Sequence, residues 1–270
     1  MKNISDIREK ETLLAERIKA AGKLAVAFSG GVDSTYLAYK AHEVLGDNAL
    51  AVTIRSQVLI DEDFEWTVEF CRNNGIRQVV IDCDVFDSEQ FENNPPDRCY
   101  YCKKMDFAAI LKAAAEQGIE IVADGSNVDD TGDYRPGMRA MLELGIVSPL
   151  KEAGLTKSDI RTLSKEAGLP TWDKPAAACL ASRFAYGEKI TAEGLVRVAS
   201  AEKFIRDLGF NGIRVRVHGS LARIEVRPED RERLLGNADE ISAKLKELGF
   251  TYVTMDMKGY RTGSMNEVLG

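Results

Sequence analysis

One segment constrains the fold more than any other: an apolar run of strand length that enters a glycine-rich turn and continues into a helix-forming segment. The run ends at Phe28, the turn reads Ser-Gly-Gly-Val-Asp-Ser over residues 29–34, and helix-forming residues follow to residue 44. Two adjacent glycines permit backbone angles and close approaches that a Cβ would prevent. The turn amides, the two serine hydroxyls and the N-terminus of the next helix together predict a cradle for phosphate or pyrophosphate.

Asp33 is the acidic residue of this turn. A carboxylate would repel phosphate directly, so we expect Asp33 to bind Mg²⁺ or to fix the loop. The turn differs from a Walker A loop, because no Gly-Lys-Ser/Thr sequence closes it, and the chain contains no Gly-x-Gly-x-x-Gly motif. The alternative is an ordinary strand–turn–helix with polar turn residues. Two adjacent glycines alone would favour this alternative, whereas the complete Ser-Gly-Gly-Val-Asp-Ser sequence favours a phosphate-binding loop.

Composition limits the classes of protein to consider. A chain of 270 residues provides one large or two modest domains. The net charge of −7 argues against a broad nucleic-acid surface, which needs clustered Lys and Arg. No apolar run approaches the roughly 20 residues that span a bilayer, and the charged start lacks the apolar region of a signal peptide. We therefore expect a cytoplasmic protein without membrane or nucleic-acid partners.

The first part of the chain alternates apolar runs with helix-forming segments. Strands are predicted at residues 24–28, 49–54, 78–81 and 119–123, and helices at residues 5–22, 35–44, 61–74 and 156–168. This alternation predicts an α/β fold with a doubly wound parallel sheet. Ligands bind beyond the carboxyl ends of such strands, so the loops that follow them are expected to share one cleft.

The last third of the chain has a different order of elements. A helix at residues 191–208, strands at 213–217 and 221–226, a helix at 228–248 and a strand at 251–256 predict a smaller C-terminal α+β domain. We expect three parts: a nucleotide-binding domain over residues 1–170, a cysteine-bearing linker over 171–190, and an α+β domain for substrate binding or oligomerisation over 191–270.

Polar residues follow the second and fourth predicted strands. Arg55, Ser56 and Gln57 follow the second, and an acidic segment at residues 124–130 follows the fourth. These residues can simply build turns, but carboxylates beside a phosphate loop also suit Mg²⁺. The residues that we expect to bind ATP are Ser29, Gly30, Gly31, Asp33, Ser34, Arg55, Ser56, Gly125, Asn127 and Arg135.

Five cysteines in a chain of this class indicate metal ligands, catalysts or core residues rather than disulfides. Cys99 and Cys102 form a Cys-x-x-Cys pair, which suits one metal, one iron–sulfur cluster or a redox pair. Cys179 lies among charged neighbours and could supply a third thiolate. Cys71 and Cys83, in a predicted helix and at a strand end, are expected to be small core residues.

The predicted hairpin of the second domain carries arginines in alternation. Arg214, Arg216 and His218 share one face of the first strand, and the apolar residues between them face inward. Arginine recognises phosphate and carboxylate through paired hydrogen bonds, so this face is expected to hold an anion. The alternative is a solvated sheet face.

Several motifs occur together in a fixed order. They are the turn at residues 29–34, the segment 124–130 with Tyr-Arg-Pro-Gly at 134–137, and Trp-Asp-Lys-Pro at 172–175 followed by Cys-Leu-Ala-Ser-Arg at 179–183. The turn resembles the PP-loop of the ATP pyrophosphatases, which release pyrophosphate and leave AMP on an acceptor. Over nearly its full length, the chain resembles the LarE-type pyridinium-3,5-bisthiocarboxylic acid mononucleotide synthases.

The resemblance implies an ATP-dependent sulfur transferase that acts during assembly of the nickel-pincer cofactor of lactate racemase. Its substrate would be pyridinium-3,5-biscarboxylic acid mononucleotide, whose carboxylates are adenylated and then converted to thiocarboxylates. In one branch of the family the cysteine matching Cys179 gives up its own sulfur. In the other branch a [4Fe-4S] cluster passes on sulfide, and Cys99 and Cys102 place the chain in this branch.

The resemblance also implies roles for individual residues. Cys179, Asp33, Arg214 and Arg216 would be catalytic, and Arg261 would contact an anion. The cluster ligands would be Cys99, Cys102 and Cys179. Glu202 and Glu225 would bind a divalent cation or line the substrate pocket. A homo-oligomer and a sulfide or other sulfur donor are implied as partners. The alternatives are a PP-loop enzyme that thiolates tRNA and a non-catalytic sensor of AMP or ATP.

Overall fold

The structure is a computed structural model that describes residues 4–132, 136–175 and 179–261. The chain forms two compact units. The first unit consists of Met1–Asp84 and Cys99–Ala177, and the second of Val85–Arg98 and Ala178–Gly270. The sequence pattern does not predict that Val85–Arg98 belongs to a different unit from the segments before and after it. The division into residues 1–170, 171–190 and 191–270 stays a prediction.

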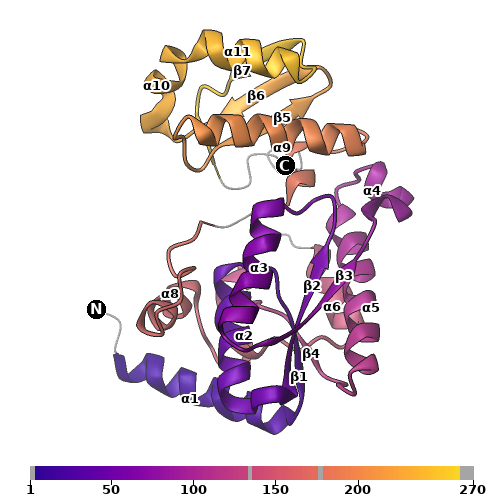
Figure 1. The fold of residues 1–270 in the computed structure, drawn as a ribbon, viewed down its shortest axis with the longest axis vertical. Coiled ribbons are helices and arrows are strands. Elements are labelled where there is room, and N and C mark those ends of the chain that lie inside the picture. Colours follow the sequence, from indigo (N-terminus) through magenta and orange to yellow (C-terminus); the bar gives the residue numbers. More distant parts are fainter. Residues whose placement is uncertain (1–3, 133–135, 176–178, 262–270) are drawn as a thin grey trace. The chain divides into compact units, whose positions relative to one another are not determined.

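The first unit is built on a parallel sheet (Figure 1). Its strands are β1 (Leu24–Ala27), β2 (Ala49–Arg55), β3 (Arg77–Asp82) and β4 (Val122–Ala123), in the order β3-β2-β1-β4. All three strand pairs are parallel, so the predicted α/β fold is confirmed. β4 is shorter than expected, since the paired part comprises two of the five residues predicted as a strand.

Helices cover both faces of this sheet. On one face lie α1 (Ile4–Ala21), α2 (Val32–Leu45), α3 (Asp61–Asn73) and α8 (Lys157–Glu166), and on the other lie α5 (Arg98–Glu116) and α6 (Pro136–Glu143). Side chains of β1 pack into the hydrophobic core on both faces of the sheet. Leu24 and Val26 pack on the face covered by α1 and α2, and Ala25 packs on the face covered by α5. Strands that are buried on both faces read as continuous apolar runs, which made them visible in the sequence.

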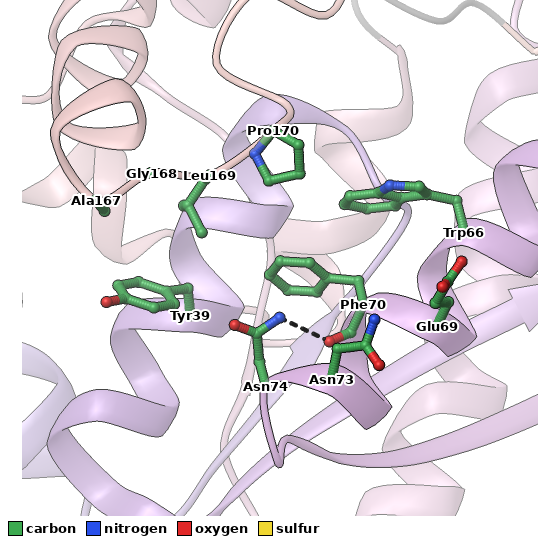
Figure 2. Close-up of a pocket in the computed structure, with 10 residues that line it drawn as sticks. All are labelled: Tyr39, Trp66, Glu69, Phe70, Asn73, Asn74, Ala167, Gly168, Leu169 and Pro170. Atoms are coloured by element: carbon green, nitrogen blue, oxygen red, sulfur yellow. Dashed lines mark hydrogen bonds between the residues drawn. The ribbon is translucent and has the colours of Figure 1, made fainter.

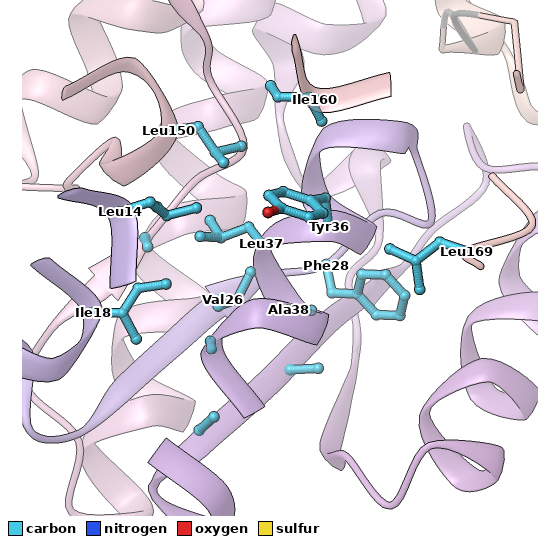
Figure 3. Packing of buried hydrophobic residues seen from close by; sticks show 14 of the residues in the cluster. Leu14, Ile18, Val26, Phe28, Tyr36, Leu37, Ala38, Leu150, Ile160 and Leu169 are labelled. Atoms are coloured by element: carbon cyan, nitrogen blue, oxygen red, sulfur yellow. The ribbon is translucent and has the colours of Figure 1, made fainter. Parts of the chain in front are cut away.

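The larger core layer lies between α1, α2 and the sheet (Figure 3). Leu14 and Ile18 of α1 meet Val26 of β1 and Leu37 of α2, and each of these side chains is at most 1% exposed. Burial of one such side chain contributes roughly 1.5–3 kcal/mol. This layer therefore anchors α2, and with it the loop that precedes α2.

Helix α8 begins with a capping box formed by Thr156 and Asp159. Thr156 accepts a hydrogen bond from the Asp159 amide, and the Asp159 carboxylate accepts one from the Thr156 amide. This reciprocal pair satisfies two amides that would otherwise lack partners, so the start of α8 is fixed.

The second unit contains a three-stranded sheet in the order β5-β6-β7. β5 (Arg214–His218) and β6 (Leu221–Glu225) are antiparallel, whereas β6 and β7 (Tyr252–Met255) are parallel. Helix α9 (Ala192–Asp207) packs against β5, and α11 (Ala238–Glu247) packs against β7. These elements form the expected α+β arrangement.

The single helix predicted over residues 228–248 is wrong. A 3-10 turn at Pro228–Asp230 leads into α10 (Arg231–Gly236), which is separated from α11 by Asn237. The Asn237 side chain donates to the carbonyl of Arg233 at 2.8 Å. Glycine followed by asparagine is a weak helix-forming pair, and the asparagine side chain competes for backbone hydrogen bonds.

Helix α5 is absent from the sequence prediction, although at 19 residues it is long and begins immediately before the Cys-x-x-Cys pair. The remaining short elements are η1 (Gly46–Asn48), η2 (Val85–Asp87), α4 (Glu89–Glu92), η3 (Val128–Gly132), α7 (Pro149–Glu152) and η4 (Leu180–Arg183). Over the residues that the structure describes, no helix has the length and apolar character needed to cross a membrane.

Candidate active site

The candidate site lies at the carboxyl end of β1, where the direction of the sheet order changes. β2 and β3 lie on one side of β1, and β4 lies on the other. Ligands of open α/β sheets bind at such switch points. The loop after β4 touches the first turn of α2, since a Cβ on Gly125 would stand 3.0 Å from the Ser34 amide nitrogen. Glycine at this position therefore lets the loop and the helix pack directly together.

The two glycines of the PP-loop have different functions. Gly30 has a φ of +71°, and a Cβ there would lie 2.8 Å from Cγ2 of Thr67, so both its conformation and its surroundings require glycine. Gly31 has an extended backbone with φ −79° and ψ 166°, which any residue can adopt. The expectation that Gly31 needs unusual backbone freedom is therefore wrong.

Gly31 instead keeps a space open. A Cβ at this position would lie 3.7 Å from Oγ of Ser29 and 3.9 Å from Oγ of Ser34. These two hydroxyls are 3.2 Å apart, and no side chain caps α2 at Gly31. The first amides of α2 and its positive dipole end thus face a space bordered by hydroxyls. This arrangement fits a phosphate group.

Asp33 lies in the first turn of α2 and forms an ion pair with Lys157, whose Nζ is 2.5 Å from Oδ2. Within the described part of the chain, the other oxygen, Oδ1, is buried and has no hydrogen-bond partner. Burial raises the pKa of Asp33, repulsion from Asp130 adds to this, and Lys157 opposes it. A buried oxygen without a partner, close to a second carboxylate, fits Mg²⁺ completed by phosphate oxygens.

A second lysine lies against the loop. Nζ of Lys174 donates to the carbonyl of Gly30 at 3.1 Å and to Asp63 at 2.8 Å, and lies 5.2 Å from the centre of the Trp66 ring. Arg161 holds this segment by donating to the carbonyls of residues 172 and 174. Sequence reasoning assigned no site role to Lys157 or Lys174. The sequence signal that could have identified Lys174 is its place in the Trp-Asp-Lys-Pro motif.

The acidic segment after β4 mainly orders its own loop. Asp124 is 5% exposed and accepts hydrogen bonds from the hydroxyls of Ser126 and Ser148. Asp130 accepts from the Asn127 amide at 2.8 Å. Asp124 thus joins its loop to Ser148, which lies before α7, and the Asn127 contact with ATP stays a prediction. Arg135 lies outside the described residues.

Arg55 and Ser56 follow β2, as expected. The Arg55 guanidinium pairs with Asp82 at the end of β3 and stacks on Phe64, 5.3 Å from the ring centre. The Ser56 carbonyl accepts a hydrogen bond from the Leu59 amide. A role for either residue in binding ATP stays a prediction.

A cavity of about 420 Å³ lies beside this site, between α2, α3 and residues 167–170 (Figure 2). Tyr39, Phe70 and Trp66 form its aromatic walls. Trp66 connects the cavity to the loop, since its ring lies 3.2 Å from the Cβ position of Gly30. None of the residues predicted to bind ATP lines this cavity.

The five cysteines differ in exposure. Cys71 is 1% exposed in the core and burial raises its pKa to about 12, as expected for a core residue. Cys83 is only partly buried, so its assignment to the core is wrong. Cys99 and Cys179 are exposed and Cys102 is partly exposed. The three predicted cluster ligands are therefore exposed or partly exposed residues.

The Cys-x-x-Cys turn is fixed against α6. A Cβ on Gly137 would lie 3.3 Å from the Cys99 carbonyl, so the two helices approach closely at this point. Tyr100, between the two cysteines, donates to Glu143 at 2.7 Å and lies 3.9 Å from the Arg139 guanidinium. These contacts hold the start of α5 while leaving the Cys99 thiol accessible.

The hairpin of the second unit buries its apolar face, as predicted. Val215 and Ile224 are 0% and 2% exposed. The charged face is also largely buried, because Arg216 is 5% exposed and forms two hydrogen bonds with Glu225 at 2.8 and 3.0 Å. A fully solvated sheet face is therefore wrong.

Glu202 and Glu225 do not fit the predicted divalent cation. Both oxygens of Glu202 accept from Arg183, and both oxygens of Glu225 accept from arginines. Over residues 4–132, 136–175 and 179–261, no three His, Cys, Asp or Glu side chains are grouped to hold a metal. The cation at Glu202 and Glu225 stays a sequence prediction, and no step is derived from it.

The same region gathers further arginines. Arg214 is partly buried 5.2 Å from the Tyr260 ring centre, and its pKa is lowered by burial and then by Arg183. Arg261 and Arg223 both pair with Asp256, at 3.1 and 3.2 Å. Partly buried arginines suit an anionic ligand, because each guanidinium can donate paired hydrogen bonds to it.

Several known proteins are similar to this chain. A family model described as NAD synthase matches residues 7–106. Pyridinium-3,5-bisthiocarboxylic acid mononucleotide synthase of Lactiplantibacillus plantarum is 39% identical over 269 residues, which are 98% of this chain and 97% of that protein.

Two further relatives differ in how much of the chain they match. An uncharacterised protein of Synechocystis is 42% identical over 246 residues, 90% of this chain and 92% of its own length. A glutamine-hydrolysing GMP synthase component from Thermoplasma volcanium is 29% identical over 173 residues, 57% of this chain and 54% of its own. The chain belongs to the pyridinium-3,5-bisthiocarboxylic acid mononucleotide synthase family and is an ATP-dependent enzyme with a PP-loop fold.

Proposed function

We propose that this protein converts the carboxylates of pyridinium-3,5-biscarboxylic acid mononucleotide to thiocarboxylates, using ATP. The observation that carries this proposal is the open space at Gly31, bordered by two hydroxyls and the uncapped start of α2, beside the partnerless oxygen of Asp33. The relative that aligns with 98% of the chain is named as a synthase of the bisthiocarboxylic product.

The reaction needs two displacements at each carboxylate. A carboxylate oxygen attacks the α-phosphorus of ATP, the bond to pyrophosphate breaks, and an acyl-adenylate forms. Sulfide then attacks the acyl carbon, AMP leaves with the electron pair of the broken C–O bond, and a thiocarboxylate remains. Adenylation is required because a free carboxylate is a poor electrophile.

The loop residues would stabilise the charge of the first step. The amides at the start of α2 and the Ser29 and Ser34 hydroxyls would bind phosphate oxygens. Asp33 would hold Mg²⁺, which would supply Lewis-acid stabilisation of the phosphate charge. Lys157 and Lys174 place positive charge on two sides of the loop. The amides, hydroxyls and lysines are already in position in the structure, and such preorganised groups stabilise a transition state most effectively.

The second unit would hold the anionic substrate. Arg214 lies partly buried beside the Tyr260 ring, where a phosphate or carboxylate gains from a guanidinium that water screens poorly. Arg261 pairs with Asp256, and its contact with an anion stays a prediction. Arg216 is already paired with Glu225, so we assign it to the support of this region. A homo-oligomer stays a prediction of the family resemblance.

Three cysteines would hold the sulfur-carrying group. Cys99, Cys102 and Cys179 are exposed or partly exposed, and thiolates are the donors that iron–sulfur clusters require. A [4Fe-4S] cluster on three cysteines would supply one open iron for an external sulfide. Sacrificial donation of the Cys179 sulfur is the other candidate, and the exposure of this thiol supports it equally.

The test combines anaerobic turnover with mass spectrometry. Purified protein is supplied with ATP, Mg²⁺, sulfide and the biscarboxylate mononucleotide, and pyrophosphate, AMP and thiocarboxylate are measured. We expect all three products. Pyrophosphate release without thiocarboxylate, or no release, would contradict the proposal. Loss of sulfur from Cys179 in the intact mass after turnover would indicate sacrifice, whereas an unchanged mass would support the cluster.

A further inference from the structure

Three buried arginines bind the backbone of the turn that begins at Cys179. Arg183 donates to the carbonyl of Cys179, Arg98 to that of Ala181 and Arg216 to that of Ser182, each at 3.0 Å. The three guanidinium-bearing residues, which we name the arginine clamp, are 1%, 5% and 5% exposed. All of them belong to the second unit.

Each clamp arginine has its own buried partner. Arg183 forms a paired bridge to both oxygens of Glu202 at 2.8 and 2.9 Å. Arg216 donates twice to Glu225, and Arg98 donates to the side-chain oxygen of Asn94. Glu202 also accepts from the amide of Val215 at 3.0 Å, which joins the clamp to strand β5.

Such burial of charge is costly unless every charge is paired, and apolar side chains of similar volume would often be as stable. The three arginines meet at one short turn, η4, whose own backbone bonds run from Ser182 to Cys179 and from Phe184 to Ala181. The arginines therefore add three hydrogen bonds to carbonyls of a turn that also makes backbone bonds of its own. The residue at its start, Cys179, stays exposed.

We propose that the arginine clamp positions Cys179 for sulfur transfer, and that Glu202 and Glu225 serve as counter-ions of the clamp rather than as cation ligands. This role rests on the proposed function of Cys179 in delivering sulfur. Arg98 directly precedes Cys99 in the chain, so one member of the clamp also ties the segment entering the Cys-x-x-Cys pair to the turn after Cys179.

The first experiment measures the clamp without activity. Hydrogen exchange of the full-length protein is followed by mass spectrometry in wild type, Glu202→Gln and the matched control Glu240→Gln, an exposed glutamate on α11. Loss of a charge-assisted hydrogen bond predicts exchange about 10-fold faster or more at the Ser182 and Phe184 amides of Glu202→Gln. The β6 amides and the control should be unchanged. Exchange at the wild-type rate in the turn would overturn the clamp.

The second experiment measures coupling between the two chemical steps. Thiocarboxylate formed per pyrophosphate released should fall about 10-fold or more in Glu202→Gln, while the KM for ATP stays at its wild-type value. A ratio equal to wild type would overturn the positioning role, and a wild type that forms no thiocarboxylate would instead reject the proposed function. If Glu202→Gln does not fold, Arg216→Lys gives the same readouts, since it keeps the charge and loses the paired geometry.

Calorimetric titration with Mg²⁺ alone separates the two roles of the glutamates. The account predicts the same heat of binding for wild type and Glu202→Gln, because Glu202 holds an arginine. Mg²⁺ binding that is present in wild type and lost in the variant would show a cation ligand and overturn this inference.

Discussion

The two adjacent loop glycines provide a sharp prediction, because the same substitution should have opposite effects at neighbouring positions. Gly30→Ala places an alanine at φ +71° and a methyl group 2.8 Å from Thr67. The backbone conformation costs roughly 1–2 kcal/mol and the overpacking about 1–3 kcal/mol. Together they lower the free energy of unfolding by about 2–5 kcal/mol, a large part of the roughly 5–15 kcal/mol of a typical domain.

Gly31→Ala should leave the fold intact. Its φ of −79° suits alanine, and the new methyl group meets no atom closer than 3.7 Å. The substitution reduces the freedom of the unfolded chain, so the free energy of unfolding should rise by about 0.4–1 kcal/mol. The methyl group occupies the space proposed for phosphate, and kcat/KM for ATP should fall about 100-fold or more, as for loss of a preorganised donor.

Both quantities are measurable on the same preparations. Urea unfolding followed by tryptophan fluorescence gives the free energy, with Trp66 reporting from beside Gly30. Substrate-dependent pyrophosphate release gives kcat/KM. Wild-type turnover by Gly31→Ala, or equal destabilisation by the two variants, would refute the reasoning.

Three further predictions concern single side chains. Asp33→Asn should abolish pyrophosphate release. Because burial raises the folded-state pKa of Asp33, its contribution to stability is lost as pH rises through that pKa, so the variant should be at least as stable as wild type near pH 7 in urea unfolding. This advantage should shrink toward about pH 4, and a variant less stable at every pH would contradict it. Iodoacetamide at neutral pH should label Cys99 and Cys179 but not Cys71, by peptide mass spectrometry, since burial raises the pKa of Cys71 to about 12. Cys99→Ser should lose iron and sulfide after anaerobic reconstitution whereas Cys83→Ser retains them; equal contents would reject the cluster.

Features of the fold that depend on neighbouring residues in the chain could be predicted from sequence. The strands are short apolar runs bounded by glycine, and the Thr156 capping box is complete within four residues. Helix α5 was missed because the Cys-x-x-Cys pair was interpreted as a site, although Phe107, Ile110 and Ala114 repeat at helical spacing and are buried.

Features that depend on distant partners could not be predicted. Lys174 pairs with Asp63 across 111 positions, and Lys157 pairs with Asp33 across 124. A sequence pattern shows that Glu202 is acidic but not that an arginine occupies both its oxygens. The difference between two adjacent glycines is likewise conformational, and only the structure distinguishes them.

The central claim is that the loop at residues 29–34 binds the phosphates of ATP for adenylation. A crystal structure with Mg²⁺ and a non-hydrolysable ATP analogue tests it most directly. The account predicts phosphate oxygens on the first amides of α2, in the space above Gly31, with Mg²⁺ on Oδ1 of Asp33. An analogue bound in the cavity lined by Tyr39 and Phe70, with the loop empty, would contradict it.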